Sequence, residues 1–155
     1  MRAAVVLIAV MALIGIGTVE AIASNAQLAD LPGRGRPSLS AGGAALTIAG
    51  VALSIAVYAA LGLVLAWTGT AEARAFVIGI GVGVAAGLAG GVIRAYLVSD
   101  YLTAVMAGYG LAGLVLVALA IFVGLSIVVS LAAGGVATWL GYRAGRRLTM
   151  RRPPR

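Results

Sequence analysis

The sequence contains no cysteine, no histidine and no lysine, and only four of its 155 residues are acidic. Without cysteine the chain forms no disulfide and supplies no thiolate nucleophile, and without histidine it has no imidazole base and no ordinary zinc site. Without lysine it lacks a Schiff-base amine and the lysine of a phosphate-binding loop. The four carboxylates lie far apart in the sequence, so no adjacent pair indicates acid–base catalysis or a metal site. We therefore expect no enzymatic activity, no bound metal and no cofactor.

Charged residues are scarce as well, at 10% of the chain, whereas 63% of the residues are hydrophobic. A water-soluble domain has ~25% charged residues, so this chain has too little polar surface to cover a globule in water. A transmembrane helix needs ~20 apolar residues, which leaves room for about four such helices and short connections. The sequence therefore predicts a small multi-pass protein of the cell membrane.

Four apolar segments alternate with polar or turn-forming residues. They predict an all-α bundle of four transmembrane helices in a single membrane domain that covers residues 1–155. Prolines and glycines in residues 24–40 predict an irregular loop after the first span, and Ser99 with Asp100 predicts a break after the third. The predicted spans are residues 3–23, 41–67, 75–98 and 110–142, and residues 143–155 form a basic tail.

Residues 1–23 fit two interpretations. A signal peptide would have Arg2 as its charged start and the small residues 21–23 as its cleavage motif before Ser24. The apolar run is longer than the ~7–15 residues of such peptides, and Glu20 lies where cleavage sites are normally uncharged. We expect a helix that is retained, and cleavage before Ser24 is the alternative.

Residues 101–142 are apolar almost throughout and too long for one straight span. A helix of that length would measure about 60 Å, twice the ~30 Å hydrocarbon core. We expect residues 101–109 to form a short interfacial or re-entrant piece that precedes the fourth span. One bent span and two separate spans are the alternatives.

All 11 basic residues are arginines, and most of them follow the fourth span. Positively charged flanks stay in the cytoplasm, so the C-terminus is predicted to be cytoplasmic, and four spans then place the N-terminus inside too. We expect the tail to contact anionic lipid headgroups, at about 1 kcal/mol per arginine, and not nucleic acid. Trp67, Trp139 and Tyr142 are expected at the same inner boundary. The tail arginines are Arg143, Arg146, Arg147, Arg151, Arg152 and Arg155.

Arg94 is a charged residue inside an otherwise apolar span. The predicted topology brings it to the outer ends of the helices together with Glu20 and Asp100. An ionisable residue near hydrocarbon is costly and is usually paired. We hypothesise that Arg94 pairs with Glu20 or Asp100, and the alternative is that it reaches the lipid headgroups unpaired.

Small residues recur at every fourth position in the third and fourth spans. This spacing keeps them on one helix face, where they allow a second backbone to approach closely. We predict that the two faces form a packing seam within the bundle or between subunits. The seam comprises Gly79, Gly83, Gly87 and Gly91 in the third span and Ser126, Ser130, Gly134 and Thr138 in the fourth.

These features favour a structural or accessory membrane subunit that acts through helix packing, as a homo-oligomer or within a larger membrane complex. The alternative is a small oligomeric channel or transporter for an ion or small solute, with Arg94 and an acidic residue at its mouth. An aqueous path requires polar side chains along one face of the bundle. The spans offer few of them, namely Thr47, Ser54, Tyr58, Ser126, Ser130 and Thr138.

Overall fold

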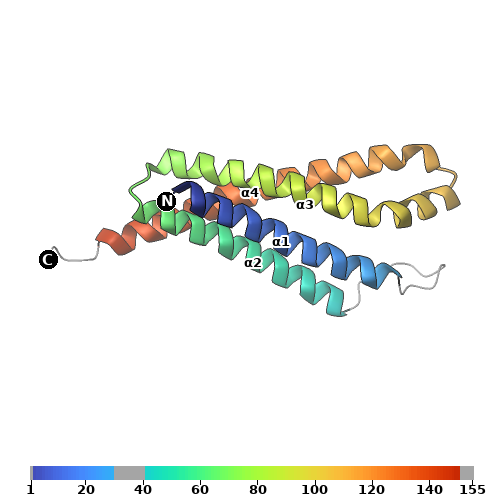
Figure 1. The fold of residues 1–155 in the computed structure, drawn as a ribbon, viewed down its shortest axis with the longest axis horizontal. Coiled ribbons are helices and arrows are strands. Elements are labelled where there is room, and N and C mark those ends of the chain that lie inside the picture. Colours follow the sequence, from blue (N-terminus) through green and yellow to red (C-terminus); the bar gives the residue numbers. More distant parts are fainter. Residues whose placement is uncertain (1, 30–40, 151–155) are drawn as a thin grey trace.

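The computed structural model describes residues 2–29 and 41–150, which form four long α-helices and one short 3-10 helix (Figure 1). These described ranges contain no strand, so the predicted all-α class is confirmed. All four long helices are long and apolar enough to cross a membrane. The elements are α1 (Arg2–Ala29), α2 (Ala41–Trp67), α3 (Glu72–Gly108), η1 (Ala112–Leu114) and α4 (Val115–Met150).

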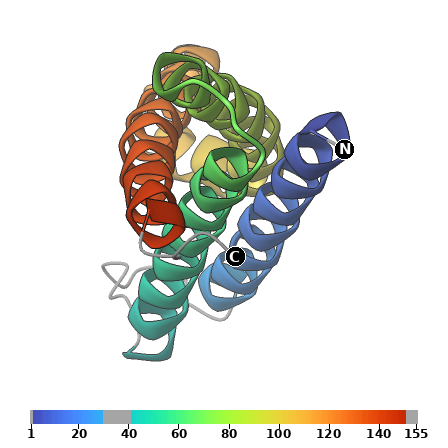
Figure 2. The same ribbon diagram turned by 90° about the vertical axis from the view of Figure 1, so that its left-hand side faces the viewer.

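The helices form an antiparallel bundle in which α3 and α4 make the most extensive contact. Helix α2 packs on α4, and α1 lies against α2 and α3 (Figures 1 and 2). The turn between α2 and α3 lies at the same end as the last turns of α4, and we call this the arginine end. The turn between α3 and α4 lies at the opposite end, which we call the hairpin end.

Helix α1 ends six residues later than predicted. The predicted loop over residues 24–40 is wrong for residues 24–29, because these contain neither proline nor glycine and continue the helix. Residues 30–40, the rest of that loop, lie outside the described residues.

The break predicted at Ser99 and Asp100 is also wrong. Helix α3 continues without interruption to Gly108, over 37 residues and therefore ~55 Å. The Ser99 hydroxyl donates to the backbone oxygen of Tyr96 at 2.8 Å, and the Thr103 hydroxyl donates to that of Ser99 at 2.7 Å. These side chains are satisfied by their own helix and do not cap a new one.

A tight turn joins α3 to α4. Of residues 101–109, which were expected to form a separate interfacial or re-entrant piece, residues 101–108 are the last two turns of α3. Gly110 has a φ of +72°, a left-handed conformation that favours glycine. The Leu111 N–H donates to the backbone oxygen of Met106 at 2.8 Å, which closes the end of α3. The fourth long helix begins at Val115, after η1, and not at residue 110.

The arginine end differs from the prediction in two ways. Residues 143–150 belong to α4 and are not a tail that follows the last helix; basic residues are favourable in the last turn of a helix because of its dipole. Tyr142, which was expected at the inner membrane boundary, is 4% exposed, so its side chain packs within the bundle. Its hydroxyl donates to the backbone oxygen of Thr70 at 2.7 Å, which ties α4 to the turn between α2 and α3.

The face of α3 that meets α4 consists of the glycines spaced by four residues. A Cβ added to Gly79, Gly83, Gly87 or Gly91 would lie within 3.0 Å of an atom of α4. Gly81 and Gly90 point elsewhere and have no atom within 4 Å of such a Cβ among the described residues. The nearest residues of α4 include Ser126, Ser130, Gly134 and Thr138.

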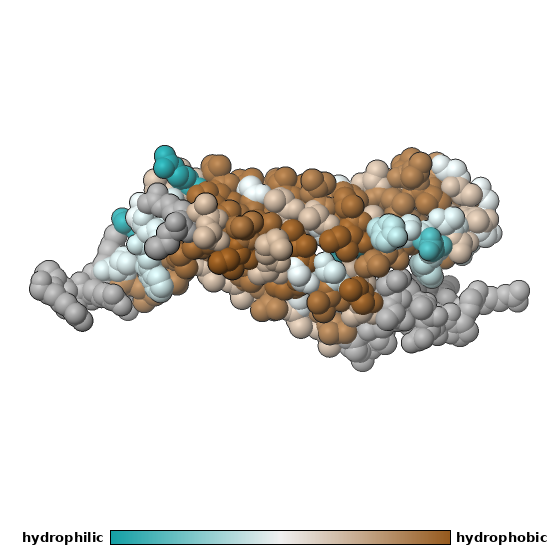
Figure 3. Space-filling model, viewed as in Figure 1, coloured by the Kyte–Doolittle hydropathy of each residue, from teal (hydrophilic) through white to brown (hydrophobic). Residues whose placement is uncertain are grey.

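Large apolar side chains cover the outside of the bundle. Ile8, Ile48 and Leu116 are 66%, 70% and 80% exposed. The apolar surface extends over the middle of the face shown in Figure 3, and hydrophilic residues gather toward the two ends. Soluble monomers rarely expose apolar patches larger than a few hundred Å². The outside of the bundle therefore has the character of a surface that faces hydrocarbon.

Candidate functional site

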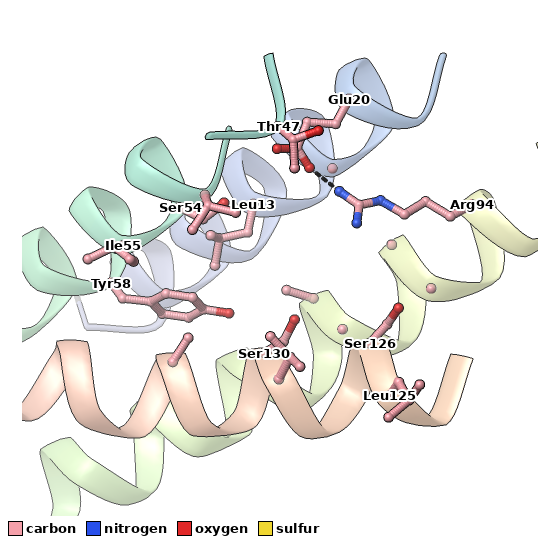
Figure 4. A pocket seen from close by; sticks show the side chains of 18 of the residues that line it. Leu13, Glu20, Thr47, Ser54, Ile55, Tyr58, Arg94, Leu125, Ser126 and Ser130 are labelled. Carbon is pink, nitrogen blue, oxygen red and sulfur yellow. Dashed lines mark hydrogen bonds and ion pairs between the residues drawn. The ribbon is translucent and has the colours of Figure 1, made fainter. Parts of the chain in front are cut away.

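A cavity of about 370 Å³ lies between the four long helices, in the half of the bundle nearer the hairpin end (Figure 4). Sites for small molecules typically measure ~300–1,000 Å³. A single water needs only ~10–15 Å³ by the same kind of measure. The cavity is therefore large enough for a small solute together with several waters.

Polar side chains from all four helices line this cavity. Figure 4 shows the hydroxyls of Ser126 and Ser130 directed from α4 toward the space, and the Tyr58 ring extends into it from α2. Ser126 also donates a hydrogen bond to the backbone oxygen of Phe122 in its own helix, at 3.0 Å. The polar lining residues are Glu20, Thr47, Ser54, Tyr58, Arg94, Ser126 and Ser130.

The structure brings Arg94 and Glu20 together in an ion pair between α3 and α1, with Arg94 Nη2 donating to Glu20 Oε2 (Figure 4). The side chain of Arg94 is 35% exposed and that of Glu20 is 13% exposed. Asp100, the other candidate partner, is exposed and forms no ion pair with Arg94 among the described residues. It lies six residues after Arg94, so the two side chains point about 120° apart around α3.

The second oxygen of Glu20, Oε1, is buried and has no hydrogen-bond partner among the described residues. A buried carboxylate oxygen without a donor is costly. The Glu20 carboxyl lies directly against Gly50 of α2, where an added Cβ would overlap it. Gly50 therefore makes the space that lets α2 close over this carboxylate.

Close backbone packing ends the cavity toward the arginine end. A Cβ on Gly62 of α2 would overlap the backbone oxygen of Thr138, and one on Gly141 would overlap that of Ala59. Thr138 is fully buried at this crossing, and its hydroxyl has no partner among the described residues. The close contact of α2 and α4 therefore closes the cavity on this side.

Apolar residues of α2 and α4 form part of the cavity wall and are also exposed on the outside of the bundle. Val51 and Ile55 of α2 are 52% and 46% exposed, and Leu125 and Val129 of α4 are 60% and 65% exposed. The cavity therefore borders the apolar outer surface between α2 and α4, beside the ion pair between α1 and α3.

A second polar cluster lies on the surface at the arginine end. Both Trp139 Nε1 and Arg143 Nε donate to Glu72 Oε1, at 2.7 and 3.0 Å. The Arg143 guanidinium also stacks over the Trp139 ring, 4.1 Å from its centre. The predicted tail residues Arg146 and Arg147 are exposed at the end of α4, and Arg151 and Arg152 lie outside the described residues.

Some residues that the sequence predicted for helix packing also line the cavity. The seam residues Gly87, Gly91, Ser126 and Ser130 serve both as packing residues and as cavity wall. Gly50 was not singled out, because nothing in the sequence distinguishes it from the other glycines. No protein-family model matches this chain, and comparisons with curated proteins and with solved structures find no match.

Proposed function

We propose that this protein is a multi-pass membrane protein whose cavity binds a small polar solute, as the substrate site of a small transporter. The observation that carries the proposal is the convergence of polar groups. The sequence analysis named six hydroxyl-bearing residues as candidates for an aqueous path. Five of them line the cavity, together with an ion pair. Packing between helices does not require this convergence, and a solute site does.

The cost of polar groups in lipid supports the proposal. An arginine or acidic residue at the centre of a transmembrane helix costs ~2.5–3.5 kcal/mol, and such residues usually mark pathways or binding sites. Arg94 and Glu20 lie between helices beside the cavity and not on the outer apolar face. The closed crossing of α2 and α4 favours a carrier, which opens to one side at a time, over an open channel.

We propose that the arginine end faces the cytoplasm, because Arg143, Arg146 and Arg147 lie there with Arg74. The cavity would then lie toward the outer side of the cell membrane. The exposed arginines at this end are suited to contact anionic lipid headgroups. The proposal also requires that residues 1–23 remain in the mature chain, because α1 supplies Glu20.

Cysteine labelling tests whether water reaches the cavity. The chain has no cysteine, so single cysteines have no background. Ser130 lines the cavity, whereas Val128, two residues away and therefore on nearly the opposite side of α4, is 61% exposed on the apolar face. In proteoliposomes we expect a water-soluble thiol reagent to modify Ser130→Cys and not Val128→Cys, because the reactive thiolate requires water.

Ser54→Cys provides a second reporter on α2 in case one substitution disturbs the fold. Each variant is first checked for the elution profile and melting temperature of the unmodified protein. If Ser130→Cys and Ser54→Cys are both inert in folded protein, the cavity is dry and the transport proposal fails.

The exposed face of α4 supports a second candidate, the accessory subunit. Only 6% of the most apolar stretch of α4 is buried, against 33% in α3. Lipid or a partner helix would cover this stretch. Native mass spectrometry in mild detergent separates the two functions and also reports cleavage before Ser24. A second protein bound at fixed stoichiometry, with inert cavity cysteines, would favour the accessory role.

A further inference from the structure

We propose that the ligand of the cavity is a zwitterion, a molecule that carries one anionic and one cationic group and no net charge. The inference rests on the proposed function and names the class of its ligand. The ligand would insert at the ion pair, with its anionic group on Arg94 and its cationic group on Glu20. One ion pair would thus be exchanged for two.

Charge neutrality is the first reason. The pair of Arg94 and Glu20 has no net charge, and Glu20 is 13% exposed in a wall that is otherwise apolar or neutral. A lone anion on Arg94 would leave the Glu20 carboxylate without a counter-charge, and a lone cation on Glu20 would do the same to Arg94. Leaving a buried charge without its partner is strongly unfavourable. A zwitterion satisfies both groups at once.

The hydrogen-bonding groups at the pair are the second reason. A guanidinium has five N–H donors, and in the structure a single hydrogen bond joins Arg94 to Glu20. Its remaining donors suit a carboxylate or phosphate, which guanidinium binds in a fork geometry. Glu20 Oε1 is buried without a donor among the described residues, and an ammonium or amine supplies one. Arg94 therefore has N–H donors available for an anionic group, and Glu20 has an oxygen available for a cationic group.

The rest of the cavity suits a ligand with a polar head and an apolar part. Hydroxyls of Ser126 and Ser130 line the cavity together with the ion pair, and the exposed apolar residues Val51 and Leu125 also border it. The zwitterionic head can therefore belong to a free solute or to a phospholipid whose chains lie on the apolar surface between α2 and α4. The charge chemistry is the same for both sources.

Three related probes separate the contributions of the two charges. Glycerophosphoethanolamine is a zwitterion, glycerophosphoglycerol carries the same singly charged phosphodiester without the amine, and ethanolamine carries the cationic part. Binding to the full-length protein in neutral detergent is measured by the shift in melting temperature and by calorimetry. We expect the zwitterion to bind at least ~10-fold more tightly than either part, which corresponds to ~1.4 kcal/mol.

Neutral variants of the pair give a readout that a purely structural ion pair would not produce. With Glu20→Gln, the preference should move from the zwitterion to the anionic glycerophosphoglycerol, because only Arg94 remains charged. With Arg94→Gln it should move to ethanolamine. The double variant E20Q/R94Q should lose the preference for charge, and it keeps the fold testable if either single variant unfolds.

A further set of probes shows whether the zwitterionic group belongs to a phospholipid or to a free solute. Short-chain phosphatidylethanolamine is compared with glycerophosphoethanolamine and with short-chain phosphatidylglycerol, which is anionic. Tighter binding of phosphatidylethanolamine than of both others assigns a lipid ligand, whereas equal binding of the two zwitterions assigns a free solute. Both results support the zwitterion. Tighter binding of phosphatidylglycerol would overturn it.

The failure of this inference is distinct from the failure of the transport proposal. If the cavity cysteines react with water-soluble reagent but glycerophosphoglycerol binds as tightly as the zwitterion, the cavity is a solute site and the inference of a zwitterionic ligand is wrong. Inert cavity cysteines together with no binding of any probe would overturn both.

Discussion

The two halves of the bundle use the same small residues for different purposes. Toward the arginine end, Gly62 and Gly141 bring the backbones of α2 and α4 into direct contact, and no space remains. Toward the hairpin end, Gly87 and Gly91 still pack α3 on α4, but α2 no longer covers α4, and the cavity with the ion pair forms there.

The difference shows that small residues close a bundle only where a partner helix approaches. Gly90 is not in contact with another helix among the described residues, and it lines the cavity. In the closed half, Gly62 of α2 and Gly79 of α3 both pack against Thr138 of α4. We therefore expect substitutions in the closed half and in the open half to have different effects on stability.

The largest effect is expected in the closed half. Gly62→Ala should lower stability by about 3 kcal/mol, because the new Cβ overlaps the backbone oxygen of Thr138 and overpacking that only backbone can relieve lies at the upper end of its usual cost. Gly81→Ala is the matched control on an open face of α3, and it should leave stability unchanged or raise it by up to ~1 kcal/mol. Thermal unfolding in one detergent measures both, and equal melting temperatures would contradict the close contact.

The next largest effect is expected at the ion pair in the open half. Arg94→Gln leaves Glu20 buried without a partner, whereas Glu20→Gln leaves Arg94, which is 35% exposed and can reach water. We expect Arg94→Gln to cost about 2 kcal/mol, less than the loss of a fully buried pair, and Glu20→Gln to cost less. The double variant E20Q/R94Q should recover part of the loss in a double-mutant cycle. Additive losses would show that the two side chains do not interact.

A smaller effect is expected at the turn between α2 and α3. Tyr142→Phe removes the hydrogen bond to the backbone oxygen of Thr70 and keeps the ring in place. The expected loss is ~1 kcal/mol, typical of one hydrogen bond to a buried acceptor. Tyr101→Phe, on α3 near the hairpin end, serves as the control with no such bond among the described residues. An unchanged melting temperature for Tyr142→Phe would show that the bond contributes nothing to stability.

The smallest effect is expected for the exposed cluster at the arginine end. Glu72 and Arg143 are 47% and 54% exposed, so their ion pair is screened by solvent. Arg143→Gln should change stability less than any of the substitutions above, and the difference should shrink as salt is added. A loss as large as that of Arg94→Gln would mean that burial does not separate the two ion pairs.

Much of the fold could be predicted from local patterns. Four apolar stretches and their polar connections indicated four helices, and the four-residue spacing of glycine marked the face of α3 that packs on α4 in the structure. Helix ends were less predictable. Ser99 and Asp100 are typical of a cap, yet both occur within α3, because the neighbouring backbone accepts the Ser99 hydroxyl and no glycine or proline interrupts the helix there.

The candidate site could be predicted only in part. The scarcity of acidic residues reduced the partners of Arg94 to Glu20 and Asp100, and the rotation of α3 selects Glu20. Six polar residues of the spans indicated a possible aqueous path, but the sequence could not show that five of them line one cavity, because this depends on how the helices pack. Gly50 is one of 23 glycines, and its role follows only from its contact with the Glu20 carboxyl.

The most direct measurement is sided labelling of cysteine variants in intact cells with a thiol reagent that does not cross membranes. Ser126→Cys reports the cavity, and Thr149→Cys reports the exposed end of α4. We expect Ser126→Cys to be labelled from outside and Thr149→Cys only after the membrane is permeabilised. Labelling of Thr149→Cys in intact cells, or of neither variant after permeabilisation, would contradict the account.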